Sequence, residues 1–321
     1  MTGVLVPLGP DAAAPLRPAT LEVLTIAREL GEVTALVHTT PDGGLLEELG
    51  AYGVTRVLTT PLPEPASAAA VAAQATSNAA RQASCAVVLF TSTFSTKEIA
   101  AHTAHQLGAG LLIDVSGLSL DEGHLVGGKR AFGGTWESVC EVRTETAVAT
   151  VAPNAVIATP AARPSTPELV DAPAQIDVPP RLELLERTVA DHSGDTRPSL
   201  AEAAIVVSGG RGTFGDFEPV EELADALGAA LGTTRDCVEE GWLPPEAMVG
   251  QTGTTVAPRV YVGAGISGAP HHIGGMAGAG TVIAVNIDDE APLVQLADFA
   301  VIGDLSSVLA DAVEVLRDHG G

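Results

Sequence analysis

Residues 249–286 contain the densest group of side chains in this sequence that could take part in chemistry. Two apolar runs of strand length, residues 259–262 and 281–285, enclose the segment GAGISGAPHHIGG. Its glycines allow positive φ angles and let a ligand come close to the backbone. A helix that starts near Gly268 would direct free N–H groups and the positive end of its dipole into the turn, where an anion could bind. The hydroxyl and the two imidazoles of the same turn belong to Ser267, His271 and His272.

A second glycine-rich segment, SGGRGTFGDF, follows the apolar run at residues 203–207. Three of its glycines fit the pattern GxGxxG between a predicted strand and a predicted helix, as in dinucleotide-binding turns. The acidic residue that such a turn needs about twenty positions later, for the ribose, has no convincing counterpart. Backbone N–H groups and Arg211 could still hold a phosphate, because a guanidinium donates two parallel hydrogen bonds. The structural alternative is a tight turn with an arginine on the surface.

Polar side chains recur at or just past the ends of the strands predicted in the second half of the chain. In doubly wound sheets the carboxyl ends of the strands meet at one edge, and ligands bind there. We therefore expect these side chains to converge on one site. They are Arg211, Thr234, Arg235, Gln251, Thr252, Ser267, His272, Asn286 and Asp304. Thr252 and Asp304 are also the best candidates for helix caps.

The elements that must position these residues are predicted to form two α/β domains. Apolar strand runs alternate with helical spacing over residues 3–118, which predicts a parallel sheet with helices on both faces. Residues 123–158 alternate like short antiparallel strands attached to that sheet. The polar break DHSGDTRP separates the domains, so we predict an N-terminal domain over residues 1–197 and a C-terminal domain over residues 198–321. The second is expected to be a doubly wound, dinucleotide-binding-like fold.

Composition limits the classes of function. The 321 residues include 40 acidic and 16 basic side chains, a net charge of −24, and such a chain lacks the basic field that nucleic acids require. Three cysteines without paired spacing indicate neither a disulfide framework nor a zinc site. The apolar N-terminus lacks the basic region and cleavage site of a signal peptide, and no apolar run reaches membrane-spanning length. We expect a cytoplasmic protein without membrane insertion and without a bound metal.

An ordered set of motifs resembles the C-terminal domain of the electron transfer flavoprotein α subunit. The motifs occur in that family's order and spacing over residues 203–316, and they are VVSGGRG, TTRDCVEEGWLP, VGQTGTTVAP, VYVGAGISGAPHHIGGM, AVNIDDEAPLVQLADF and IGDL. The N-terminal half resembles the family more loosely, through TSTFSTKEIAAHTAHQLGAG and GGKRAFGGTWESV. Thr254 stands in place of the family's usual lysine, and Pro270 and His271 replace its frequent isoleucine and glutamine.

The resemblance implies an FAD held mainly by the C-terminal domain, in a heterodimer with the electron transfer flavoprotein β subunit. The N-terminal domain would then serve as scaffold and β-subunit contact. Position by position, the implied FAD-binding set is Arg211, Thr234, Arg235, Val249, Gly250, Gln251, Thr252, Ser267, Gly268, Ala269, Pro270, His271, His272, Asn286, Asp304 and Leu305.

The same resemblance implies an electron carrier and not an enzyme, with no catalytic acid, base or nucleophile. Electrons would come from flavin dehydrogenases, such as acyl-CoA dehydrogenases, and pass to a quinone oxidoreductase or another acceptor. His272 would donate to the negative charge that a reduced flavin ring can carry, Thr252 would hydrogen-bond the ring, and Arg235 would favour its electron-rich states. Two alternatives stay open: an NAD-dependent α/β oxidoreductase that uses GGRGTFG, and a subunit of an electron-bifurcating flavoprotein.

Overall fold

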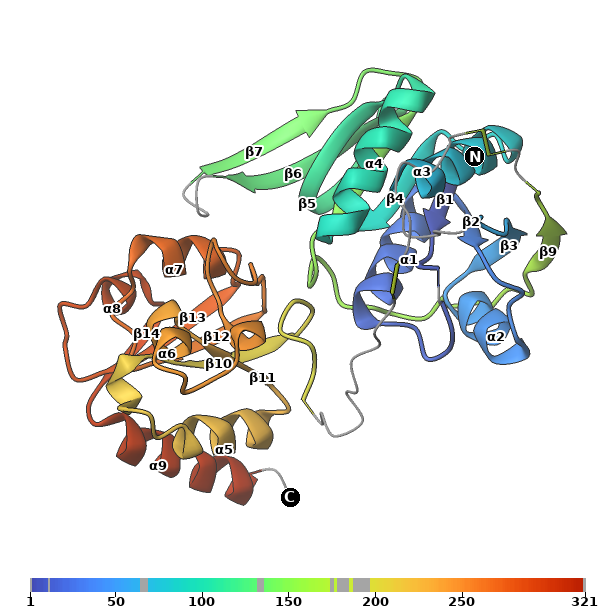
Figure 1. Cartoon of the computed structure of the whole chain (residues 1–321). Coiled ribbons are helices and arrows are strands. Elements are labelled where there is room, and N and C mark those ends of the chain that lie inside the picture. Colours follow the sequence, from blue (N-terminus) through green and yellow to red (C-terminus); the bar gives the residue numbers. More distant parts are fainter. Residues whose placement is uncertain are drawn as a thin grey trace. The chain divides into compact units, whose positions relative to one another are not determined.

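The computed structural model describes residues 2–10, 12–63, 69–131, 136–173, 176–177, 185–186 and 197–319, apart from the side chains of residues 130 and 131. The chain divides into two compact units, Met1–Lys129 with Glu137–Val189 and Arg130–Trp136 with Ala190–Gly321 (Figure 1). Each unit is a mostly parallel sheet flanked by helices, as the sequence predicts. Most of the predicted break DHSGDTRP lies outside the described residues, and the exact domain limits stay a prediction.

The first unit is built on a nine-stranded sheet with the order β7-β6-β5-β8-β4-β1-β2-β3-β9. Its strands are β1 (Gly3–Pro7), β2 (Glu32–Val37), β3 (Val54–Thr59), β4 (Val87–Thr91), β5 (Gly110–Asp121), β6 (His124–Ala131), β7 (Trp136–Glu141), β8 (Ala147–Val151) and β9 (Glu168–Asp171). Its helices are α1 (Pro18–Leu30), α2 (Gly43–Ala51), α3 (Ala69–Gln82) and α4 (Phe94–Leu107). The strands from β5 to β9 in this order run parallel, whereas β6 runs antiparallel to β5.

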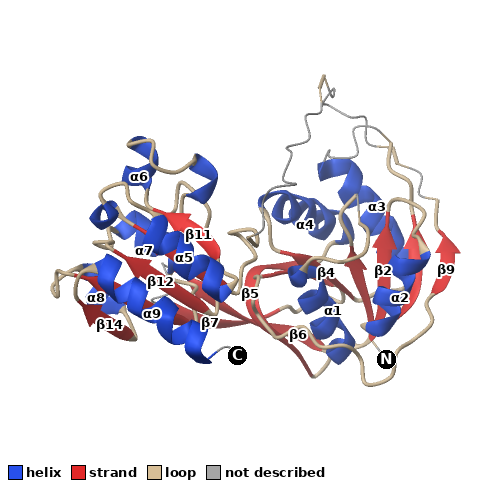
Figure 2. Ribbon diagram, turned by 90° about the horizontal axis from the view of Figure 1, so that it is seen from below, coloured by secondary structure: helices blue, strands red, loops and turns tan. Residues whose placement is uncertain are grey.

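Helices cover both faces of this sheet because successive residues of each buried strand point to opposite sides. Val4 and Val6 of β1 pack with α1 and α2, and Leu5 between them packs with α3 and α4. Figure 2 shows these two helical layers on either side of the strands. The second layer is rich in alanine, including Ala79 and Ala100, so its helices approach the strands closely without large side chains.

One sequence-based expectation for the first unit is wrong. Residues 147–151 do not form an antiparallel hairpin strand, since β8 inserts between β4 and β5 and runs parallel to both. Alternation of polar and apolar residues indicates which face of a strand is buried but not the direction in which the strand runs. It therefore could not distinguish antiparallel from parallel pairing of residues 147–151. A further strand, β9, was not predicted; it pairs parallel with β3 at the edge of the sheet.

The second unit contains a five-stranded parallel sheet with the order β11-β10-β12-β13-β14. The strands are β10 (Ile205–Gly209), β11 (Ala230–Thr233), β12 (Val260–Ala264), β13 (Thr281–Asn286) and β14 (Phe299–Ile302). The helices are α5 (Glu218–Leu227), α6 (Arg235–Glu239), α7 (Pro270–Met276), α8 (Pro292–Leu296) and α9 (Leu305–His319), with short 3-10 turns at Arg211–Thr213 and Pro245–Ala247.

The second sheet also has two helical layers, which makes it doubly wound. Val207 and Val262 pack in one cluster with residues of α5 and α9. On the opposite face, Val206 and Tyr261 pack with residues of α7 and α8. Adjacent residues of β10 thus contribute to different layers, and the sheet is buried on both sides.

The sequence-based prediction of the second unit is wrong at the ends of two helices and misses two short helices. The helical spacing of residues 220–231 predicts a helix over that whole range, but the observed helix stops at Leu227, because Gly228 adopts a left-handed conformation with φ of 60° and residues 230–233 form β11. The helix expected to start near Gly268 begins at Pro270, which suits the first turn because its missing N–H has no partner within the helix there. The short helices α6 and α8 were not predicted, since five residues carry too little periodicity to identify a helix.

Across the residues that the structure describes, no helix combines the length and apolar character needed to cross a membrane.

Candidate functional site

The connections in the second unit change side between β10 and β12. From β10 the chain moves to β11 on one flank, and the later strands follow on the other flank. Loops at such a point diverge, and a crevice forms between them at the carboxyl ends of the strands. A cavity of about 1050 Å³ lies at this edge and is lined by residues that follow all five strands. Its volume lies at the upper end of the range of roughly 300–1,000 Å³ for ligand pockets.

This cavity gathers all but two of the residues that the resemblance assigns to FAD. The lining includes Arg211, Thr234, Arg235, Val249, Gly250, Thr252, Ser267, Gly268, Ala269, His271, His272, Asn286, Asp304 and Leu305. Gln251 and Pro270 are exposed and are not part of the lining. The predicted convergence of strand-end side chains is therefore observed for the rest of the set.

Several lining residues were not in the predicted set. The most informative are Phe214, Asp236, Glu239, Glu240, Trp242 and Ile266. Three of these are carboxylates, and only Glu239, four positions after Arg235, has the helical spacing that could have found it. Phe214, which is 86% exposed and has a left-handed φ of 52° in the turn after β10, carries no comparable signal.

Close approach of two turns shapes the floor of the cavity. A Cβ on Gly212 would lie 2.7 Å from the Cα of Gly265, so both turns need glycine where they meet. The Gly212 N–H donates to the Gly265 carbonyl at 3.0 Å. Gly212, a member of the GxGxxG match, therefore joins the turn after β10 to the turn after β12. Residues 214–217 separate its short 3-10 turn from the start of α5, unlike a dinucleotide turn that leads directly into its helix.

Gly268 is the second position where the site requires glycine. Its φ is +88°, and a Cβ would come within 2.5 Å of the Leu293 backbone nitrogen. The Leu293 N–H donates to the carbonyl of Ser267 at 3.1 Å, so the turn after β12 is tied to the start of α8. This tie leaves the exposed Ser267 side chain at the lining.

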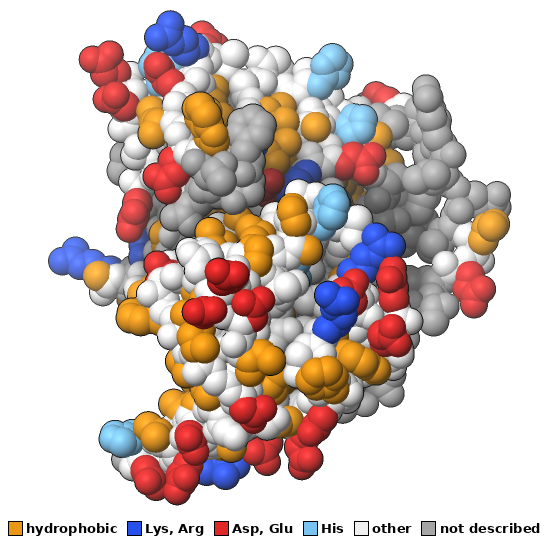
Figure 3. Space-filling view, turned by 90° about the vertical axis from the view of Figure 1, so that its left-hand side faces the viewer, with side chains coloured by type: hydrophobic (Ala, Val, Ile, Leu, Met, Phe, Trp, Pro, Cys, Tyr) orange, Lys and Arg blue, Asp and Glu red, His pale blue; other side chains and the backbone are white. Residues whose placement is uncertain are grey.

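Both arginines of the site are paired with carboxylates of α6. The Nε of Arg211 lies 3.1 Å from Asp236, and the Nε of Arg235 lies 2.7 Å from Glu239. More than half of each of these four side chains is exposed, so water screens both pairs. Basic side chains lying directly beside acidic ones are also visible in the space-filling view (Figure 3). The cavity thus offers cationic groups whose charge is partly offset.

His272 lies at the back of the cavity with both ring nitrogens engaged. Its Nε2 is 2.7 Å from the hydroxyl of Tyr261, and its Nδ1 is 3.1 Å from the carbonyl oxygen of Val249. Burial lowers the pKa of His272 to about 4, and the hydrogen bond to Val249 opposes that shift. The imidazole is therefore neutral near pH 7. This bonding differs from the direct donation to a flavin that the sequence suggests.

His271 and Gln251 form a polar contact at the rim. The Nδ1 of His271 lies 3.0 Å from Oε1 of Gln251, and the Gln251 N–H donates to the carbonyl of His271, also at 3.0 Å. These two bonds fasten the turn that carries Val249 and Thr252 to the first turn of α7. Gln251 therefore supports the site from outside, whereas His271 lines it.

Asn286 and Asp304 hydrogen-bond to backbone groups of the site, whereas Thr234 contacts a side chain. The side-chain amide of Asn286 donates to the carbonyl of Ile266 at 3.0 Å and so holds the turn after β12. Asp304 accepts from the N–H of Ser307 at 3.0 Å and caps α9, one of the two predicted caps. The hydroxyl of Thr234 lies 3.3 Å from the sulfur of Cys237 in α6.

These residues fit a flavin dinucleotide. Glycines bring backbone close to the cavity, two guanidinium groups supply positive charge, and hydroxyls at Thr234, Thr252 and Ser267 supply donors and acceptors. Ile266 and Trp242 add apolar surface suited to a ring system. Convergent polar groups on an otherwise apolar cleft are typical of cofactor sites.

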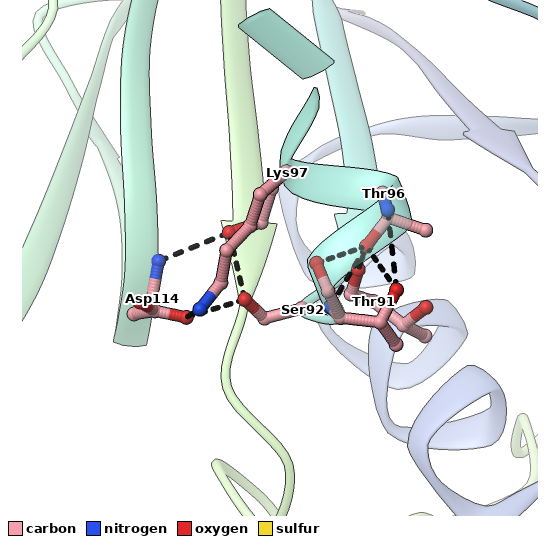
Figure 4. Close-up of polar contacts among 7 residues, drawn as sticks. Thr91, Ser92, Thr96, Lys97 and Asp114 are labelled. Carbon is pink, nitrogen blue, oxygen red and sulfur yellow. Dashed lines mark hydrogen bonds and ion pairs between the residues drawn. The ribbon is translucent and has the colours of Figure 1, made fainter. Parts of the chain in front are cut away.

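A second polar cluster belongs to the first unit, at the ends of β4 and β8 (Figure 4). A bulge in β5 places Asp114 in a left-handed conformation with φ of 58°. Its carboxylate accepts from the Ser92 hydroxyl and lies 2.8 Å from Nζ of Lys97, while its N–H donates to Thr150 at 3.0 Å. A capping box of Thr93 and Thr96 satisfies the N-terminus of α4. The members bind one another, so we interpret this cluster as structural.

Comparison with known proteins agrees with the resemblance. Residues 199–277 match the model of the electron transfer flavoprotein FAD-binding domain, and residues 10–176 match the model of the electron transfer flavoprotein domain. The first match covers the turns after β10, β11 and β12, which contribute much of the cavity lining.

Curated relatives match the chain over nearly its whole length. An electron transfer flavoprotein subunit alpha of Mycobacterium leprae is 37% identical over 95% of this chain and 96% of its own. The protein of the same name from Mycobacterium tuberculosis H37Rv is 38% identical over the full length of both chains. That from Syntrophomonas wolfei is 34% identical over 94% of this chain and 95% of its own.

Proposed function

The chain belongs to the electron transfer flavoprotein α-subunit family, and we propose that it carries electrons in a heterodimer with the β subunit. Its electron donors are flavin dehydrogenases, such as acyl-CoA dehydrogenases, and its acceptor is a quinone oxidoreductase or another redox protein. In this role it is a carrier and not an enzyme that converts a substrate. The family match favours this function over an NAD-dependent oxidoreductase.

One observation carries the proposal: all but two of the residues implied by the resemblance line a single cavity of about 1050 Å³. The second unit contains the FAD-binding domain of the family, and FAD is its cofactor. When bound, FAD supplies the ring that takes up and releases electrons. The protein supplies binding, orientation and the electrostatic surroundings.

We assign the binding of the phosphates to Arg211 and to the backbone of the glycine-rich turns. A guanidinium can hold phosphate oxygens by two parallel hydrogen bonds. Ser267 adds a hydroxyl group from a neighbouring turn, whereas Thr252 is assigned to the flavin ring. This assignment requires Arg211 to exchange or share its contact with Asp236, which costs little because both side chains are largely exposed.

We assign the tuning of the reduction potential to Arg235. Its guanidinium stays cationic at every physiological pH, so it lowers the energy of electrons added nearby. Glu239, four residues later on α6, lies 2.7 Å from it and offsets part of that charge. The net influence of α6 on the cofactor is thus set by a pair of residues and not by the arginine alone.

The test is the visible spectrum of the chain co-purified with its β subunit, with flavin content measured per heterodimer and followed through stepwise reduction. One FAD per heterodimer, reduced reversibly by an acyl-CoA dehydrogenase with its substrate, is the expected result. Two flavins per heterodimer would indicate the bifurcating type. A colourless complex that binds NAD would refute the proposal.

An Arg235→Gln variant extends this test. It should still bind FAD but have a lower reduction potential, because a permanent positive charge is lost. Arg259→Gln is the matched control, since Arg259 lies before β12, at the opposite edge of the sheet from the cavity. An unchanged potential in Arg235→Gln would reject the role assigned to this residue.

A further inference from the structure

Tyr261 and His272 form a buried pair immediately behind the cavity. Tyr261 lies in the middle of the sheet on β12 and is 0% exposed, and His272 in the first turn of α7 is 6% exposed. The phenol oxygen is 2.7 Å from Nε2 of the imidazole. His272 lines the cavity, whereas Tyr261 does not. The tyrosine can therefore influence a ligand in the cavity through the histidine.

The partners of His272 determine where its proton lies. The carbonyl of Val249 can only accept a hydrogen bond, so the Nδ1 facing it at 3.1 Å carries the hydrogen. A neutral imidazole then has a lone pair on Nε2, and the Tyr261 hydroxyl must donate to it. His271, the adjacent titratable group on α7, is turned to Gln251.

This arrangement uses every hydrogen-bonding position of the imidazole. Nδ1–H is committed to Val249 and the Nε2 lone pair to Tyr261. His272 consequently has no N–H left to direct into the cavity. An N–H donor on Nε2 requires either a second proton on the ring or a shift of the hydrogen from Nδ1 to Nε2, which breaks the bond to Val249. In both cases Tyr261 must stop donating to Nε2.

We propose that Tyr261 is a positioning residue that holds His272 with its proton on Nδ1 and so withholds an Nε2–H donor from the cofactor. The part of this inference that concerns FAD rests on the proposed function. The part that concerns the proton position does not, because it follows from contacts within the chain. Burial of both groups supports it, since burial raises the pKa of Tyr261 and lowers that of His272, leaving both neutral.

The proton position is tested first, by nitrogen NMR of the histidine rings in the full chain, with and without FAD. His272→Gln assigns the His272 signals, and His271→Gln confirms that the neighbouring ring is not being observed. The expected result is a single neutral tautomer with the hydrogen on Nδ1 at pH 7. A hydrogen on Nε2, or a doubly protonated ring, would overturn the proposal without any other variant.

Tyr261→Phe then tests the hydroxyl while keeping the ring that fills the core. Loss of the donor should raise the protonation constant of His272 about tenfold, which raises its pKa by about one. The reduction potential of bound FAD should rise, because Nε2 becomes free to carry a proton toward the cavity. An unshifted His272 titration in a folded Tyr261→Phe chain would contradict the proposal.

A double-mutant comparison separates positioning from packing. Potentials are measured for the native chain, Tyr261→Phe, His272→Gln and the double variant. If Tyr261 acts through His272, its substitution changes the potential only when His272 is present. An equal change in both backgrounds would reject the positioning role. A native complex that binds no FAD would refute the proposed function and leave the NMR result to decide the proton position.

Discussion

The guanidinium of Arg211, on the turn after β10, lies 3.1 Å from the carboxylate of Asp236 on α6. The pair joins two segments that each contribute to the cavity lining. It sets the charge that Arg211 presents to a phosphate, because an arginine already shared with a carboxylate attracts a second anion less strongly. The two side chains are 68% and 54% exposed, so their ion pair contributes little to the free energy of unfolding. We expect it to affect ligand binding instead.

Asp236→Asn should therefore strengthen FAD binding. Removing the competing charge is expected to lower the dissociation constant about fivefold, corresponding to an exposed ion pair of about 1 kcal/mol. Titration of flavin fluorescence at low and high salt measures the effect, which salt should reduce. Thermal unfolding should change little. Glu222→Gln on α5 is the control, an exposed charge outside the lining, and weaker binding by Asp236→Asn would contradict the prediction.

Gly268→Ala should damage the site and the stability of the second unit together. The new Cβ would meet the Leu293 backbone at 2.5 Å in a residue with φ of +88°. The left-handed conformation costs about 1–2 kcal/mol and the overpacking about 1–3 kcal/mol more. Urea unfolding and retained FAD are the measurements.

Gly228→Ala is the matched control for that substitution. Gly228 has a similar positive φ of +60°, but a Cβ at this position would have no neighbouring atom within 4 Å. Only the conformational cost, about 1–2 kcal/mol, should appear there, with FAD retained. Equal losses for the two variants would show that the contact with Leu293 is unimportant.

Asp114→Ala should destabilise the first unit without changing the flavin spectrum. It removes the acceptor of Ser92 and the partner of Lys97, and it leaves alanine in the left-handed conformation. A loss of about 1–3 kcal/mol in the free energy of unfolding is expected. Asp114→Asn should cost less, since asparagine tolerates this conformation and keeps an acceptor oxygen. Glu98→Ala, an exposed change on α4, is the control, and a loss as small as that control's would refute the prediction.

The buried His272 should make the protein less stable in mild acid. Burial lowers its pKa to about 4 in the folded state from the ordinary value of 6.5, so between these values the unfolded chain binds a proton that the folded chain excludes. The free energy of unfolding then falls as the pH falls, by at most about 1.4 kcal/mol per pH unit. Above the ordinary pKa this contribution is constant.

Comparison of variants isolates that contribution from the many carboxylates. Urea unfolding is measured from about pH 7.5 to about pH 4.5 for the native chain, His272→Gln and His271→Gln. The difference between the native chain and His272→Gln should shrink as the pH falls, whereas His271→Gln should follow the native chain. A constant difference for His272→Gln would exclude the linkage.

Local patterns in the sequence were enough to predict the two-unit α/β architecture and most members of the candidate site. Strand and helix periodicities are local: the sequence pattern predicts a strand over residues 299–302, the observed limits of β14, and a helix over residues 306–317, within two residues of each end of α9. The strand-end rule then placed polar residues from distant segments at one edge, because parallel strands share the direction of their carboxyl ends. The ordered motifs, from VVSGGRG to IGDL, identified the family.

Which of those polar groups contact each other depended on the tertiary structure. The insertion of β8 between β4 and β5, and the pairing of Arg211 with Asp236, rest on contacts between segments that local periodicity does not encode. The same holds for His272, which the sequence marks as a donor to the cofactor. Its ring nitrogens instead contact Tyr261 and Val249, because burial against β12 leaves the imidazole only partners within the chain.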